Sequence, residues 1–213
     1  MEQSGDSDAS ACLRRHAKWG LINQAAQESD LIFLLVDLDE FKLVNDKYGH
    51  QAGDRLLVEI GHALVASCRD SDVVARWGGD EFLVIARFTN GSEAKRIAER
   101  IRRAVAGRLV ELADGQTAGT TCSVGYGVFP FDARRSSLGW RHVLALADHA
   151  SYDAKHNGRN RCVGYTAGPI ALPTAETAEI SRANAEGWLQ SRQLKREVVE
   201  RVRPSSADAA VQD

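Results

Sequence analysis

The chain has 213 residues, enough for one domain with a sizeable core and an additional terminal segment. Its 44% hydrophobic and 26% charged residues are ordinary for a soluble globular protein, and the formal net charge of −2 provides no basic surface for nucleic acid. The longest aliphatic and aromatic run, residues 31–36, is too short to span a membrane. We therefore expect a cytoplasmic protein that binds neither nucleic acid nor membrane.

The N-terminal part begins with a polar segment that does not have the pattern of a signal peptide. Residues 1–11 are predicted to be disordered, and the spacing of Leu and Ala over residues 13–28 predicts a helix. The continuous apolar run 31–36 predicts a strand that is buried on both faces and ends in residues 37–39, Asp-Leu-Asp.

Two helices are predicted after this strand. Residues 40–47 fit a short helix that Gly49 closes. A second helix is expected to begin at Asp54, whose side chain fits an N-cap, and to end near Cys68.

The stretch Arg-Trp-Gly-Gly-Asp-Glu-Phe, residues 76–82, lies between two short apolar runs and predicts a β-hairpin. Gly78 and Gly79 permit a tight turn and leave room for a ligand to approach the backbone. Asp80 and Glu81 follow at the tip, and adjacent exposed carboxylates suit a hard cation such as Mg²⁺. Taken alone, the same stretch also fits an ordinary polar turn.

The second half of the chain continues the alternation of helices and strands. Ser92 is expected to cap a helix over residues 94–105, and alternation over 121–129 predicts a strand. A further helix is expected over residues 140–156, followed by an edge strand at 162–165. This order, with a hairpin in the sheet, favours an α+β fold with a mostly antiparallel central sheet surrounded by helices.

The composition changes after Thr166, where Gly and Pro residues indicate a linker. Residues 175–202 carry a thin apolar stripe that predicts one long helix. We expect this helix to self-associate or to bind a separate protein partner, and a poorly ordered linker helix fits the stripe equally well. We therefore divide the chain into a disordered N-terminus (1–11), a main domain (12–166), and a linker with a C-terminal helix (167–213).

Several motifs, taken in order, resemble the GGDEF family of diguanylate cyclases over roughly residues 30–165. The matching pieces are Asp37-Leu38-Asp39-x-Phe41-Lys42, Asn45-Asp46-x-Tyr48-Gly49-His50-x-x-Gly53-Asp54, Arg76-x-Gly78-Gly79-Asp80-Glu81-Phe82, Ser123-Val124-Gly125 and Ala147-Asp148-x-Ala150-x-Tyr152-x-Ala154-Lys155-x-x-Gly158-Arg159-Asn160. The resemblance implies a palm-like, nucleotidyl-cyclase-type sheet. It also implies a bacterial signalling enzyme that joins two GTP molecules into cyclic dimeric GMP and releases pyrophosphate.

By this resemblance, Asp37, the Leu38 carbonyl and Asp80 hold Mg²⁺ or Mn²⁺ against the triphosphate. Glu81 is a second metal ligand or a base, and the sequence leaves these two roles open. The metal would offset charge at the α-phosphate as the 3′-hydroxyl of the opposing GTP attacks. Since two nucleotides must face each other, the resemblance also implies a homodimer with two-fold symmetry.

The resemblance assigns further residues to the substrate. The Phe41-Lys42 backbone opens a helix and meets phosphate oxygens, Gly78 and Gly79 admit the nucleotide, and Lys155 and Arg159 hold the β- and γ-phosphates from one helical face. Asn45 and Asp54 would recognise guanine, because a carboxylate accepts hydrogen bonds from its N1–H and N2–H₂. Without the resemblance, the two basic residues fit a solvated helix end.

A second site is implied by Arg69 and Asp72, which match the family's Arg-x-x-Asp inhibitory pattern ahead of the hairpin. They would bind the product, cyclic dimeric GMP, although the same residues fit a solvated turn. Residues 11–15 lack most of the Asp-x-Leu-Thr-Gly-Leu-x-Asn-Arg segment that usually opens the family's domain. This departure leaves an alternative open: a weak or inactive module that binds GTP or cyclic dimeric GMP as a sensor or interaction domain.

Overall fold

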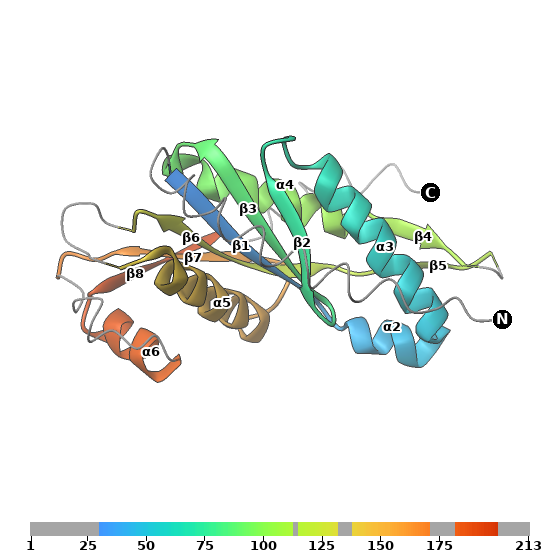
Figure 1. The fold of residues 1–213 in the computed structure, drawn as a ribbon. Helices are drawn as coiled ribbons and strands as arrows, with labels where there is room; N and C mark the ends of the chain where they lie inside the picture. Colours follow the sequence, from blue (N-terminus) through green and yellow to red (C-terminus); the bar gives the residue numbers. More distant parts are fainter. Residues whose placement is uncertain (1–29, 113–114, 132–137, 171–181, 200–213) are drawn as a thin grey trace, which may run out of the picture.

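A computed structural model describes residues 30–112, 115–131, 138–170 and 182–199. The core of the fold is a six-stranded sheet in the order β2-β3-β1-β6-β7-β8, with helices on both faces (Figure 1). All neighbouring strands are antiparallel except β6 and β7, which are parallel. The predicted α+β fold with a mostly antiparallel sheet is therefore confirmed.

The strands of this sheet are β1 (Asp30–Leu38), β2 (Val73–Gly78), β3 (Glu81–Thr89), β6 (Cys122–Phe129), β7 (Cys162–Ala167) and β8 (Leu194–Val199). The helices are α2 (Phe41–Tyr48), α3 (His50–Ala66), α4 (Ala94–Ala106), α5 (Trp140–His156) and α6 (Arg182–Gln190), and a short 3₁₀ turn, η1 (Gly91–Glu93), precedes α4. A separate hairpin, β4 (Leu109–Glu111) with β5 (Thr117–Gly119), lies beside α3, and its two strands were not predicted from the sequence.

The central strand β1 is buried on both faces, as its continuous apolar run predicts. One set of alternate residues packs with α3 and α4, and the other set packs with α5. These sets are Ile32, Leu34 and Val36 on the first face, and Leu31, Phe33 and Leu35 on the second. Each such fully buried side chain stabilises the fold by about 1.5–3 kcal/mol, so β1 holds both layers together.

One predicted helix start and one predicted helix cap were wrong. Helix α3 begins at His50, not after Asp54, because Gly49 adopts φ 82° and turns the chain directly from α2 into α3. Asp54 therefore lies inside the helix. Ser92 lies in the 3₁₀ turn η1, where its backbone N–H donates to Asn90 Oδ1, so Asn90 caps η1, and α4 begins at Ala94 without a side-chain cap.

The prediction of a single C-terminal helix over residues 175–202 was wrong for residues 191–199, which are not helical. Helix α6 ends at Gln190, and β8 then pairs antiparallel with β7, so residues 162–165 do not form an edge strand. An exposed edge of β7 would leave backbone groups unpaired, and a strand satisfies them. Ala185 and Trp188 of α6 pack in a core with α5, and the predicted binding of a partner by the C-terminal segment stays a prediction.

The predictions for residues 1–11 and 13–28 lie outside the described residues, as do the ends of the predicted C-terminal helix. The proposed division between the main domain and the C-terminal segment stays a prediction. Each helix of the described ranges is too short or too polar to cross a lipid bilayer.

Candidate active site

The sheet places the predicted metal-binding carboxylates at one end of β1. Asp37 is the register partner of Glu81 on β3, and the buried Leu38 donates its backbone N–H to the carbonyl of Asp80 at 3.3 Å. On its other side, Asp37 pairs in register with Ser123 on β6. The antiparallel pairing thus brings together groups that are more than 40 residues apart in the sequence.

The tip of the β2–β3 hairpin is held by Arg76. Its Nε and Nη2 donate to the Gly79 carbonyl at 2.9 and 2.6 Å. Gly79 adopts φ 29°, and a Cβ at this position would meet nothing within 4 Å. Gly78 and Gly79 are both exposed. The turn is therefore open to a ligand, as the glycine pair predicts.

Helix α5 closes the site from the second face of the sheet. Lys155 Nζ donates to Asp37 Oδ1 at 2.6 Å, and both side chains are largely buried. The cleft around this ion pair also includes Glu81, Asp148 and Ser151. In this structure Lys155 therefore neutralises the carboxylate that the sequence predicted as a metal ligand.

Both carboxylates on the facing strands have raised pKa values. Burial raises the pKa of Asp37 above its ordinary value, and the negative charges of Asp80 and Asp39 add to the increase, while Lys155 opposes it. Burial likewise raises the pKa of Glu81, assisted by the charges of Asp37 and neighbouring acidic residues. Carboxyl groups are thus gathered at the end of β1, where burial and mutual repulsion disfavour their charged forms.

This concentration of oxygen ligands fits a hard divalent cation, which would relieve the mutual repulsion. The donors available are the carboxylates of Asp37, Asp80 and Glu81 and the carbonyl of Leu38. In the described part of the chain, no three His, Cys, Asp or Glu side chains are already gathered into a metal-binding group. Since Asp37 is held by Lys155, a bound metal would replace this lysine as the partner of Asp37.

Asp39, to which the sequence analysis gave no role, is a structural anchor of the site. It is 5% exposed and accepts hydrogen bonds from Thr121 Oγ1 at 2.5 Å, Ser123 Oγ at 2.7 Å and the backbone N–H of Asn160 at 3.0 Å. The carboxylate thus ties the end of β1 to β6 and to the turn after α5. The second acidic residue of Asp-Leu-Asp was the only local signal for this role.

Arg159 does not share a helical face with Lys155, and that prediction was wrong. Helix α5 ends at His156, and Arg159 follows in a turn with φ 56°. The exposed Arg159 side chain lies 3.9 Å from a carboxylate oxygen of Glu40 at the start of α2. The two predicted phosphate-binding cations therefore occupy neighbouring but separate places.

The residues predicted to contact substrate at α2 differ in exposure. Phe41 is buried and Lys42 is exposed in the first helical turn, after Glu40 in a left-handed conformation. Asn45 lies against α3, where a Cβ at Gly53 would come within 1.9 Å of its Oδ1. Only glycine at position 53 permits this close approach. Asn45 therefore lies next to Gly53, the residue that precedes Asp54.

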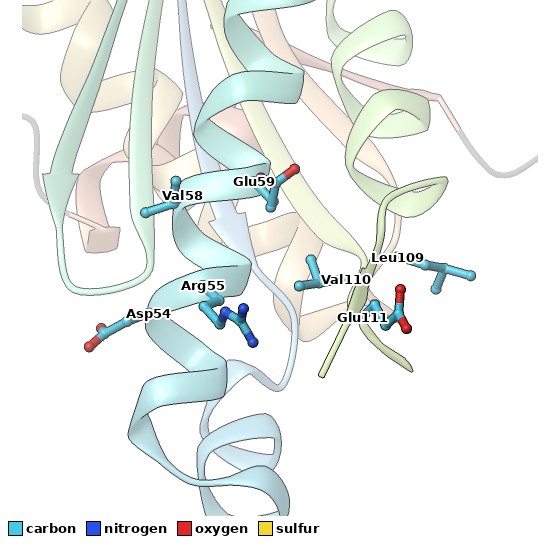
Figure 2. Close-up of a pocket in the computed structure, with 7 residues that line it drawn as sticks. All are labelled: Asp54, Arg55, Val58, Glu59, Leu109, Val110 and Glu111. Atoms are coloured by element: carbon cyan, nitrogen blue, oxygen red, sulfur yellow. The ribbon is translucent and has the colours of Figure 1, made fainter. Parts of the chain in front are cut away.

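Asp54 is exposed on α3, at the rim of a groove between this helix and β4. In Figure 2, Asp54 and Val58 leave α3 on the side away from β4, whereas Arg55 and Glu59 point toward the β4 strand. The carboxylate of Asp54 therefore lies at the outer edge of the groove, where it is exposed and available to a ligand.

Arg69 and Asp72, the predicted product-binding pair, differ in how their side chains are used. Arg69 has an exposed side chain, but Asp72 uses both of its oxygens locally. They accept backbone N–H groups of Arg69 at 2.9 Å and of Arg87 at 3.2 Å. Asp72 thus stabilises the turn before β2, which is the alternative role that the sequence left open.

Comparison with known proteins places this geometry in a family. Diguanylate cyclase A from Treponema denticola is 38% identical over 141 residues, which cover 66% of this chain and 37% of that protein. Diguanylate cyclase DgcZ from Escherichia coli K12 is 36% identical over 138 residues, covering 65% of this chain and 45% of that protein. The chain thus spans less than half the length of these relatives.

Solved structures agree with the sequence matches. The GGDEF domain of YfiN (TpbB) from Pseudomonas aeruginosa is 35% identical with a TM-score of 0.62, over 70% of this chain and 92% of that chain. The GGDEF domain of DgcB from Caulobacter crescentus, solved with cyclic dimeric GMP, is 26% identical with a TM-score of 0.61, over 76% of this chain and 91% of that chain. The family model described as "Diguanylate cyclase, GGDEF domain" matches residues 12–161, and the chain therefore belongs to the GGDEF domain family of diguanylate cyclases.

Proposed function

We propose that this chain is a diguanylate cyclase, which condenses two GTP molecules into cyclic dimeric GMP and releases pyrophosphate. The observation that carries the proposal is the register of Asp37 opposite Glu81, next to Asp80, with Lys155 of α5 at hydrogen-bond distance from Asp37. Three carboxylates and one cation at an open glycine turn suit the binding of a metal-bound triphosphate.

The residues have separate parts in this reaction. Asp37, Asp80, Glu81 and the Leu38 carbonyl would hold a divalent cation, which supplies Lewis-acid stabilisation of charge at the α-phosphate. Lys155 would leave Asp37 and bind the terminal phosphates of GTP instead. Arg159 would likewise leave Glu40 and bind these phosphates. The backbone N–H groups of Phe41 and Lys42 in the first turn of α2 would donate to phosphate oxygens.

We further propose that Asn45 and Asp54 select guanine, since their polar groups can pair with its Watson–Crick edge. ATP should then have a kcat/KM at least about a hundredfold lower than GTP, because a site built for one hydrogen-bonding edge rejects the analogue that lacks it. Comparable kcat/KM values for the two nucleotides would contradict this assignment.

The reaction requires two bound nucleotides face to face, so we propose a homodimer with two-fold symmetry.

The decisive test is the variant Asp80→Asn, assayed for cyclic dimeric GMP by chromatography with GTP and Mg²⁺. Loss of a metal ligand should reduce turnover at least about a hundredfold, while thermal unfolding changes little because Asp80 lies in a surface turn. Glu93→Gln is a matched control, since Glu93 is a carboxylate in η1, which follows the other end of β3. Parent-like turnover by Asp80→Asn would show that the site is wrongly assigned.

If the unaltered chain binds GTP but produces no cyclic dimeric GMP, the enzyme assignment is replaced by the alternative of a module that only binds nucleotide.

Product inhibition through Arg69 is also part of our proposal, supported by the exposure of its side chain. Arg69→Ala should weaken the calorimetric affinity for cyclic dimeric GMP and remove the slowing of progress curves. An unchanged affinity together with unchanged slowing would exclude Arg69 from a product site.

A further inference from the structure

Strand β8 lies beyond the residues that the family model matches, yet it is an integral part of the sheet. It pairs with β7 from Cys162 opposite Val199 to Ala167 opposite Leu194. Its side chains engage both layers of the fold. On the α4 face, Glu197 accepts from Tyr126 Oη at 3.3 Å and lies 3.4 Å from Lys95 Nζ.

On the α5 face, β8 reaches the helix that carries Lys155. Arg196 Nη2 donates to Asp153 Oδ1 at 2.6 Å, and Tyr165 Oη of β7 donates to Asp153 Oδ2 at 3.0 Å. The Asp153 side chain is only 10% exposed. A carboxylate at this depth requires partners, and Arg196 supplies the charged one.

Asp153 also organises the end of α5. The backbone carbonyl of Asp153 accepts two hydrogen bonds from Asn157, one from the backbone N–H and one from Nδ2, each at 3.0 Å. Asn157 Nδ2 also donates to the carboxylate of Asp153. The carbonyl of the next residue, Ala154, accepts from the backbone N–H of Arg159 at 3.1 Å. The turn that carries Arg159 therefore begins at the residues that Arg196 holds.

The last turn of α5 is thus held by two sets of contacts. Lys155 is hydrogen-bonded to Asp37 at the end of β1, and Asp153 is hydrogen-bonded to Tyr165 of β7 and Arg196 of β8. In the proposed reaction, GTP would draw Lys155 away from Asp37, and the first of these connections would then be lost. The connection through Asp153 then has to keep the helix end, and with it Lys155 and Arg159, in place.

We propose that Arg196 is a positioning residue of the nucleotide site, acting through Asp153 on the end of α5. This inference rests on the proposed function, because it assumes that Lys155 and Arg159 hold the phosphates of GTP. Helix ends open more readily than helix centres, so loss of the charged partner should loosen the last turn before it affects the core. The predicted consequence is weaker nucleotide binding rather than slower chemistry.

The experiment compares Arg196→Met, which keeps an apolar stem, with Arg196→Lys and with the control Lys195→Met. Lys195 is exposed on the same strand, so the control removes one positive charge at the neighbouring position. Binding is measured by calorimetry with Mg²⁺ and 3′-deoxy-GTP, which lacks the attacking hydroxyl, and turnover is measured with GTP. We expect Arg196→Met to raise Kd and KM about threefold to tenfold, with kcat changed by less than about twofold.

Arg196→Lys should recover part of the affinity, and Lys195→Met should match the parent. A purely structural role would instead reduce the folded fraction, which lowers kcat and leaves KM unchanged, and that result would overturn the inference. Equal affinity of Arg196→Met and Lys195→Met would overturn it as well. Failure of the unaltered chain both to bind 3′-deoxy-GTP and to convert GTP would overturn the proposed function, and this inference with it.

Discussion

Replacing Asp39 by alanine should destabilise the protein through three lost hydrogen bonds at a buried position. The carboxylate accepts from two hydroxyls, those of Thr121 and Ser123, and from the backbone N–H of Asn160. A hydroxyl can rotate toward another partner, but the backbone N–H cannot, and an unpaired buried donor costs about 1–3 kcal/mol. Hydrogen bonds to a charged acceptor contribute about 1.5–3 kcal/mol each, and such terms do not add fully.

From these contributions we expect Asp39→Ala to lower the free energy of unfolding by about 3–5 kcal/mol. Asp39→Asn should cost only about 1–2 kcal/mol, because its oxygen can still accept from Thr121 and Asn160 while its amide donates to Ser123 Oγ. The loss should also displace the turn of residues 157–160, which contains both Arg159 and Asn160. Nucleotide affinity should therefore fall in parallel with stability.

Urea unfolding followed by tryptophan fluorescence measures both variants, with Glu40→Ala as the control. Glu40 is the adjacent carboxylate, but its side chain is 57% exposed, so its removal should change stability by less than about 0.5 kcal/mol. An unchanged m-value shows that the same surface is exposed on unfolding. A loss below about 1 kcal/mol for Asp39→Ala, or equal losses for alanine and asparagine, would refute the assigned hydrogen-bond network.

Two further predictions concern the packing of α5 and the carboxylates of the site. A Cβ on Gly125 would lie 2.0 Å from the Ala147 carbonyl and 2.1 Å from the Ser151 nitrogen, so Gly125→Ala should cost at least about 2 kcal/mol in urea unfolding. Since burial raises the pKa of Glu81, the ionised carboxylate destabilises the fold above that pKa but not below its ordinary value. Glu81→Gln should therefore raise the Tm at pH 7, and this gain should disappear below about pH 4.

Each of these predictions has a result that would contradict it. A Gly125→Ala variant as stable as the parent would mean that α5 can move away from β6 without cost. A Tm gain of Glu81→Gln that persists at low pH would mean that the gain arises from packing and not from charge.

The sequence by itself determined the elements whose pattern lies within a short segment. The unbroken apolar run before Asp37 predicted the doubly buried β1, and the Gly-Gly pair between two apolar runs predicted the β2–β3 hairpin. The order of the motifs was sufficient to predict the family, which the match over residues 12–161 confirms. These features depend on side-chain periodicity and turn chemistry, which neighbouring residues specify.

Only the tertiary structure decided which distant groups meet. Asp39 and Asn160 are 121 residues apart in the sequence, and Asp37 and Lys155 are 118 apart, so no local pattern specifies either contact. The stripe around Leu194 led to the prediction of a helix, and the free edge of β7 decided in favour of β8. Pairing with an available sheet edge satisfies backbone groups that a helix would leave exposed on β7, and this long-range requirement outweighs local helix propensity.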